Sequence, residues 1–107
     1  MNLTETSVNG ITIGECNVNG THLKGKVRVT YAGIVERIGE PTFSVKDGDE
    51  LDRVRAVWNF KSMEGDVATL YDWNESKPIE DVQLWHIGGH SVWALQIIED
   101  ALGIKIG

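Results

Sequence analysis

The sequence predicts one α+β domain over residues 1–107, with a mainly antiparallel sheet of about four to six strands. Three observations predict it. Segments that alternate apolar and polar residues are separated by short turn-forming stretches, which is typical of an antiparallel meander. Apolar residues recur with helical period near 30–38 and near 91–102. The length of 107 residues is enough to bury one core.

Residues 1–29 predict short strands joined by tight turns. Asn-Gly pairs at 9–10 and 19–20 accept the positive φ angles of hairpin turns. Residues 11–13 and 26–29 alternate as strands do. His22 is expected to be an exposed polar residue of this region.

Two helices are predicted from their caps and apolar stripes. Thr30 is a good N-cap for a helix of about two turns, and Gly39 and Pro41 end it. Ser91 is expected to cap an amphipathic C-terminal helix that stops at Gly103. Between the two helices, residues 53–61, 67–73 and 82–87 predict three strands of a meander. Trp58 and Trp93 are assigned to the core.

Composition and charge narrow the range of functions. A net charge of −6 argues against general nucleic-acid binding, which draws on clustered Lys and Arg. No apolar run has the length of a membrane span, and the N-terminus does not resemble a signal peptide, so we expect a cytosolic protein. The single cysteine, Cys16, has no partner for a disulfide or a thiolate metal site. The acidic run 46–52 lacks the ligand spacing of a calcium loop and predicts a solvated or partner-facing loop.

Residues 85–93 contain the main candidate for a binding motif. A strand is expected to end at Gly88 and Gly89, and a helix to begin after His90 and Ser91. Glycines before a helix leave backbone N–H groups open, and the first helical turn adds donors and partial positive charge. This arrangement favours an anion site. A Gly-Gly turn that only changes the chain direction is the equally weighted alternative.

Five segments of the chain resemble a family of small uncharacterised bacteriophage proteins. They are residues 18–25, 38–41, 55–58, VATLYDW at 67–73 and the stretch beginning WHIGG at 85–91. The resemblance spans roughly residues 18–102 and implies a phage protein made in the cytoplasm of an infected bacterium. Small accessory phage proteins often disarm host defence or redirect host machinery, so the resemblance implies an anti-defence role.

Three functional hypotheses remain open. The first is a module that sequesters a small phosphate-bearing, nucleotide-derived signal through donors, cations and stacking rings. Its candidate ligand-binding residues are Arg53, Arg55, Tyr71, Trp73, Trp85, His86, Gly88, Gly89, His90 and Ser91, with Lys61 as a further source of charge. The second is a protein-contact inhibitor of a host complex, acting through the acidic loop and exposed aromatics.

The third hypothesis is a phosphodiesterase-like enzyme, with His86 and His90 as acid and base and Asp72 orienting one imidazole. Because the chain has no nucleophile elbow, phosphate loop or helical zinc motif, we expect no catalytic residue, metal or cofactor. Exposed strand edges and extra aromatic residues predict a homo-oligomer.

Overall fold

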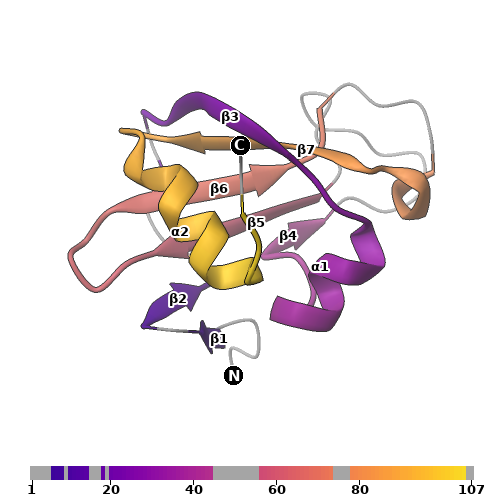
Figure 1. Ribbon diagram of the computed structural model, residues 1–107, viewed down its shortest axis with the longest axis horizontal. Coiled ribbons are helices and arrows are strands. Elements are labelled where there is room, and N and C mark those ends of the chain that lie inside the picture. The colour runs from indigo at the N-terminus through magenta and orange to yellow at the C-terminus, as the bar shows by residue number, and fades with distance from the viewer. Residues whose placement is uncertain are drawn as a thin grey trace.

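The computed structural model describes residues 6–8, 10–14, 18, 20–44, 56–73 and 78–105, and it confirms the α+β class. Within these ranges, seven strands and two α-helices form the fold (Figure 1). The elements are β1 (Thr6–Val8), β2 (Ile11–Ile13), β3 (His22–Arg28), α1 (Tyr31–Ile38), β4 (Phe43–Ser44), β5 (Ala56–Lys61), β6 (Val67–Tyr71), the 3₁₀ turn η1 (Ile79–Asp81), β7 (Leu84–Gly89) and α2 (Trp93–Leu102). The described residues form one strand more than the four to six predicted. The additional strand is β4, whose two residues are too few to show an alternation of apolar and polar residues.

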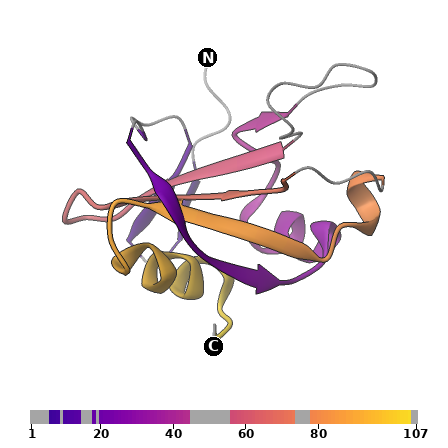
Figure 2. The ribbon, with the colours of Figure 1, turned by 90° about the horizontal axis from the view of Figure 1, so that it is seen from above.

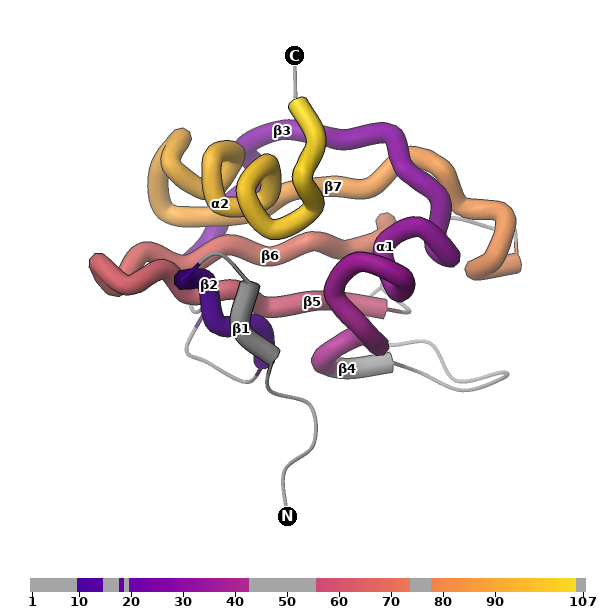
Figure 3. The backbone as a smooth tube through the Cα atoms, turned by 60° about the horizontal axis from the view of Figure 1, so that its bottom comes forward, coloured from indigo at the N-terminus to yellow at the C-terminus, as the bar shows by residue number. Residues whose placement is uncertain are grey.

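All strand pairings within the described residues are antiparallel, in the order β1-β2-β5-β6-β7-β3, with β4 beside β5. The predicted meander of three strands is therefore confirmed as β5-β6-β7. Figure 3 shows β3, β7, β6 and β5 side by side in that order. The chain thus passes from the β1–β2 hairpin at one end of the sheet to β3 at the other end. The turn predicted before β2 is also confirmed at Gly10, which has a φ of 80° between the paired residues Val8 and Ile11.

The core lies between the sheet and the two helices, which cover the same face (Figure 2). Trp58 and Phe60 of β5, Leu70 of β6 and Ile87 of β7 are fully buried on this face, as the alternation of the strands requires. The buried helical side chains are Ile34 and Ile38 of α1 and Ala94, Ile97, Ile98, Ala101 and Leu102 of α2. The amphipathic stripes predicted from the sequence are the stripes that pack on the sheet.

Two tryptophan side chains hold α1 against the sheet. The Trp85 indole N–H donates to the carbonyl oxygen of Val29 at 2.8 Å, just before the N-cap Thr30. The Trp58 indole N–H donates to the carbonyl oxygen of Gly39, the C-cap, at 2.9 Å. A helix of eight residues has little stability alone, so these bonds and the packing beneath it are what keep it folded.

The same two indoles form an aromatic cluster with the first residue of α1. Trp58 and Trp85 meet edge to face with ring centroids 5.5 Å apart, which is a favourable geometry for an aromatic pair. Tyr31 stacks on Trp85 at 6.2 Å and tilts against Trp58 at 5.9 Å. The placement of Trp58 in the core is confirmed.

Helix α2 packs closely on the sheet because two strand positions lack side chains. A Cβ on Gly89 of β7 would lie 2.3 Å from the Cβ of Ala94, and a Cβ on Gly25 of β3 would lie 2.7 Å from Leu95 Cδ2. Glycine at both positions therefore lets the helix approach the backbone of β7 and β3. Gly103 ends the helix in the left-handed region, as predicted.

The acidic C-terminal turn of α2 is balanced by a residue of α1. Glu99 and Asp100 oppose the helix macrodipole. The Arg37 guanidinium of α1 lies beside Gly103, 3.1 Å from the position of a Cβ on that residue. A cation at this helix end interacts favourably with the exposed carbonyl groups. The last turn of α2 has no basic residue of its own, so the packing of α1 against α2 supplies one.

Two tryptophan assignments made from the sequence are wrong. Trp93 is 62% exposed, because α2 begins at this residue and its apolar stripe passes through Ala94 and Ile97. Trp85, predicted as a stacking surface for a ligand, is fully buried in the aromatic cluster. Both residues lie in the same short segment of the sequence. The register of β7 determines that the Trp85 ring is buried, and the rotation of α2 about its axis determines that the Trp93 ring is exposed.

Replacing either buried tryptophan with phenylalanine is expected to loosen α1 selectively. Trp58→Phe and Trp85→Phe each remove an indole donor from a backbone carbonyl and leave a cavity, for a loss of about 2–4 kcal/mol in unfolding free energy. Hydrogen exchange should increase at residues 31–38 more than in α2. Trp93→Phe, at an exposed position, is the matched control and should leave both quantities unchanged. Equal acceleration in both helices would contradict the assignment.

Gly89→Ala is expected to destabilise the fold by about 1–3 kcal/mol, because the added methyl meets the Cβ of Ala94, which is fixed to the helix backbone. Gly25→Ala is the matched control and should cost less, since it meets the movable end of Leu95. Denaturant unfolding measures both changes. In a double-mutant cycle, Ala94→Gly should reduce the loss of unfolding free energy that Gly89→Ala causes. If the two free-energy changes simply add, the side chains at these positions do not collide.

Candidate functional site

The predicted Gly-Gly turn is not a turn in the structure. Gly88 and Gly89 are the last two residues of β7, paired with β6 on one side and with β3 on the other. Their backbone groups lie in the ladders of the sheet, and neither residue has a positive φ. The prediction failed because close packing of a strand against its neighbours and a tight turn both favour glycine.

The start of α2 also has fewer open donors than an anion site requires. The Trp93 N–H donates to Ser91 Oγ at 3.3 Å, and the Ala94 N–H donates to the Ser91 carbonyl oxygen at 3.1 Å. The Leu95 N–H donates to the carbonyl oxygen of Val92 at 3.0 Å. The N-cap of α2 is Val92, not Ser91 as predicted, and it makes no side-chain cap bond, while the first amides of the helix already have acceptors.

A different arrangement of polar and aromatic residues lies on the face of the sheet opposite to α1 and α2. The register pairs Val57 with Tyr71, Tyr71 with His86, and His86 with Lys26. Paired residues direct their side chains to the same face, and neighbouring strands lie about 4.8 Å apart. Arg28, two residues beyond Lys26, shares that face. We call Lys26, Arg28, Tyr71 and His86 the Tyr71–His86 face.

The two rings of this face are held next to each other. Tyr71 and His86 stack with centroids 5.7 Å apart and an interplanar angle of 22°. A Cβ on Gly88 would lie 2.6 Å from Thr69 Oγ1, so this glycine lets Thr69 lie close to β7, and the same Cβ would be in ordinary contact with Tyr71 Cε1 at 3.5 Å. Both rings are half-buried, whereas Lys26 and Arg28 are exposed.

Burial raises the pKa of the Tyr71 hydroxyl above its ordinary value of 10.0. The phenol is therefore neutral at physiological pH and keeps its proton for donation to an acceptor. With a neutral donor, an imidazole and two cations on one surface, the Tyr71–His86 face can combine ring stacking with charge-assisted hydrogen bonds.

The remaining predicted site residues are distributed over the molecule. Arg53 and Arg55, like Cys16 and the acidic loop 46–52, lie outside the described residues. Trp73 follows β6 and is 46% exposed. His90 is exposed beyond the end of β7, with its Nε2 3.7 Å from the position of a Cβ on Gly20. The structure therefore brings Tyr71 and His86 together, and it places His90 and Ser91 at the start of α2.

The three residues of the enzyme hypothesis have different surroundings in the structure. His86 stacks on Tyr71, whereas His90 lies at the turn near Gly20. Asp72 is fully buried, and its Oδ1 accepts from the backbone N–H of Ala56 at 3.0 Å. In the described part of the chain, no three His, Cys, Asp or Glu residues lie together as candidate metal ligands.

Sequence reasoning missed Lys26 and Arg28 as candidate site residues. The alternation of residues 26–29 predicted a strand, and it could have shown that the two cations share a face. The pairing of β3 with β7 could not be predicted from the sequence, because Arg28 and Leu84 are 56 residues apart and three other strands, β4, β5 and β6, intervene.

Comparisons with protein-family models, curated proteins and solved structures gave no match. No helix in the described ranges has the length and hydrophobicity needed to cross a bilayer. The candidate site therefore depends on the geometry of this chain alone.

Both tyrosines of the chain are expected to titrate above pH 10.0 in the folded protein. Burial raises the pKa of each, and for Tyr31 the charges of Glu40 and Glu80 and a hydrogen bond to Glu40 add to the effect. Because the folded pKa exceeds the unfolded one, the associated stability is fully present below about pH 10 and is lost as pH rises through the folded pKa.

Tyrosinate absorbance against pH, in native and in unfolded protein, measures these shifts. Tyr71→Phe isolates Tyr31, and in that variant Glu40→Gln should lower the remaining pKa. The matched variant Tyr31→Phe isolates Tyr71, whose titration Glu40→Gln should not alter. A native titration at or below pH 10.0 would contradict the burial of these rings.

Proposed function

We propose that this protein binds and sequesters a small phosphate-bearing, nucleotide-like ligand on the Tyr71–His86 face. The observation that supports the proposal is the row of paired residues Tyr71, His86 and Lys26, in which a ring stack adjoins a strand position that carries a lysine on the same face. A nucleotide needs both kinds of contact, since its base stacks on aromatic rings and its phosphate accepts from cations.

The geometry supports a small ligand better than a long nucleic acid. Lys26 and Arg28 of β3 are the cations nearest to His86 in the register, and Lys61 of β5 shares this side of the sheet four residues beyond Val57, the partner of Tyr71, while the chain as a whole has a charge of −6. A nucleic-acid groove would need a longer basic track to offset that charge. One or two phosphates can be held by Lys26 and Arg28, with the base over Tyr71 and His86. Trp73, two residues beyond Tyr71, is a further exposed ring for stacking.

The proposed biological role follows the resemblance to small bacteriophage proteins. A phage protein that captures a nucleotide-derived signal would act in the cytoplasm of the infected bacterium as an anti-defence protein. Stoichiometric capture needs a binding site and no catalytic group. A homo-oligomer, with sites repeated on each copy, remains part of this proposal.

Contact inhibition of a host complex is the alternative, and it would use other surfaces of the molecule. The acidic loop at 46–52, first considered for that role, lies outside the described residues. Ligand capture predicts sensitivity to substitutions on the Tyr71–His86 face, whereas contact inhibition does not.

The proposal is tested by calorimetric titration with ATP, AMP, cyclic di-AMP and inorganic phosphate. At least one nucleotide is expected to bind and to raise the melting temperature. Lys26→Ala and Tyr71→Leu should each weaken binding of that nucleotide by about tenfold, through loss of a charge-assisted bond and of a stacking surface. Lys26→Ala should leave the melting temperature of the free protein unchanged, because the side chain is exposed.

Two matched variants distinguish this face from other surfaces. Lys105→Ala makes the same charge change on the exposed segment after α2 and should leave affinity within about twofold. His90→Ala tests the site first expected at the start of α2. Loss of binding in His90→Ala but not in Lys26→Ala would move the site there, and absence of binding by every probe would refute the proposal.

A further inference from the structure

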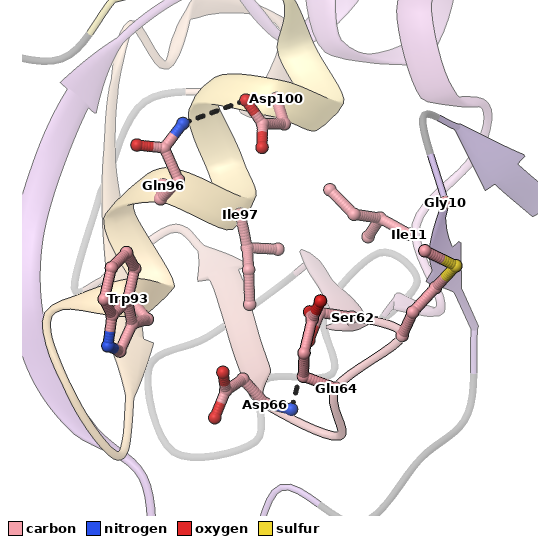
Figure 4. Close-up of a pocket in the computed structure, with 10 residues that line it drawn as sticks. Gly10, Ile11, Ser62, Glu64, Asp66, Trp93, Gln96, Ile97 and Asp100 are labelled. Atoms are coloured by element: carbon pink, nitrogen blue, oxygen red, sulfur yellow. Dashed lines mark hydrogen bonds between the residues drawn. The ribbon is translucent and has the colours of Figure 1, made fainter.

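A second surface, separate from the Tyr71–His86 face, lies where α2 meets two hairpin turns. There an open hollow of about 440 Å³ is bordered by α2, the β1–β2 turn at Gly10 and the β5–β6 turn (Figure 4). This volume lies within the range of natural ligand pockets and suits one or two side chains of a partner. We call it the Trp93 groove.

The interior of the Trp93 groove is apolar. Ile11 of β2 and Ile97 of α2 are buried and line the cavity beneath its rim. Trp93 and Met63 are 62% and 82% exposed, although both are large and hydrophobic. Figure 4 shows Trp93 on the helix and Ile97 between it and the hairpin residues. Exposed Trp and Met beside buried aliphatic side chains are typical of the centre of a protein–protein interface.

The two hairpin turns are positioned against each other at this groove. A Cβ on Gly10 would lie 3.4 Å from both Sδ and Cε of Met63, so the thioether lies over the glycine of the β1–β2 turn. The β5–β6 turn is closed by hydrogen bonds between Ser62 and Asp66, through both the backbone and the Ser62 hydroxyl. The apolar wall that faces α2 therefore has a defined shape before any partner binds.

The rim of the groove is acidic. Glu64 and Asp66 come from the β5–β6 turn and Asp100 from α2, and all three are exposed. Gln96 donates to Asp100 Oδ1 at 2.9 Å, which orients that carboxylate along the helix. The described residues that line the groove include no Lys or Arg. A partner that enters it must therefore be cationic near the rim and apolar at its centre.

We propose that the Trp93 groove binds an arginine-containing segment of a partner protein. A guanidinium group stacks on an indole face and at the same time donates to carboxylates in its plane. Over Trp93 it would reach the acidic rim, while an apolar neighbour in the segment packs on Ile97 and Met63. The partner surface is thus complementary in charge and polarity to what the groove presents.

The proposal is tested with a short peptide, acetyl-Ala-Leu-Arg-Leu-Ala-amide, followed by amide and indole NMR signals of the full chain. Saturable shifts are expected at Trp93, Gln96, Asp66 and the Met63 methyl group. The peptide with citrulline in place of arginine keeps the shape without the charge, and it should bind at least fivefold more weakly. Equal binding of both peptides, or shifts centred on Lys26 and His86, would overturn the proposal.

Substitutions in the protein complete the test. Trp93→Ala should abolish the shifts at Gln96, and Asp66→Asn should weaken the arginine peptide at least threefold while leaving the citrulline peptide unchanged. Glu36→Gln, the same kind of charge loss on the exposed face of α1, is the matched control and should change neither. Lys26→Ala should also leave binding of both peptides unchanged. The test of the Trp93 groove is therefore independent of the test of nucleotide binding on the Tyr71–His86 face. Absence of saturable shifts up to millimolar peptide would refute the groove as a docking site.

Discussion

The two indole hydrogen bonds from the sheet to α1 are the constraint on which the rest of the fold depends. Trp58 and Trp85 come from β5 and β7, on either side of β6, and their donors reach opposite ends of the same short helix. The distance between the two strands therefore has to match the length of α1. With α1 held in this way, Arg37 lies at the C-terminal end of α2, so the aromatic cluster also brings a cation to that helix end.

Strand β7 connects this core to the candidate site. Its odd-numbered residues Trp85, Ile87 and Gly89 face the helices, whereas His86 and Gly88 face the other side. Gly89 admits α2 on one face, and Gly88 leaves room for the Thr69 hydroxyl on the other. Close packing on both sides of one strand explains two consecutive glycines without any turn. Because the two faces of β7 pack differently, the six residues of this strand contribute both to the stability of the core and to the proposed binding surface.

The two proposed binding surfaces have opposite electrostatic character. The Tyr71–His86 face presents Lys26 and Arg28 beside stacked rings, and the Trp93 groove presents carboxylates around an apolar centre. The Tyr71–His86 face suits an anionic ligand and the Trp93 groove suits a cationic segment. We therefore expect each surface to bind its own partner without competition from the other surface. For a small protein, such separation allows ligand capture and protein contact to be tested independently.

The sequence alone determined the local structure of this protein. Alternation identified the strands of the meander, and caps such as Thr30 and Gly103 marked the helix ends, because these signals depend on residues close in the chain. Tertiary structure decided which tryptophan is buried, what Gly88 and Gly89 do, and that Lys26 lies beside His86. Those outcomes depend on strand register and on contacts between segments distant in sequence. Periodicity carries no information about such contacts, so the candidate site emerged only once the sheet was assembled.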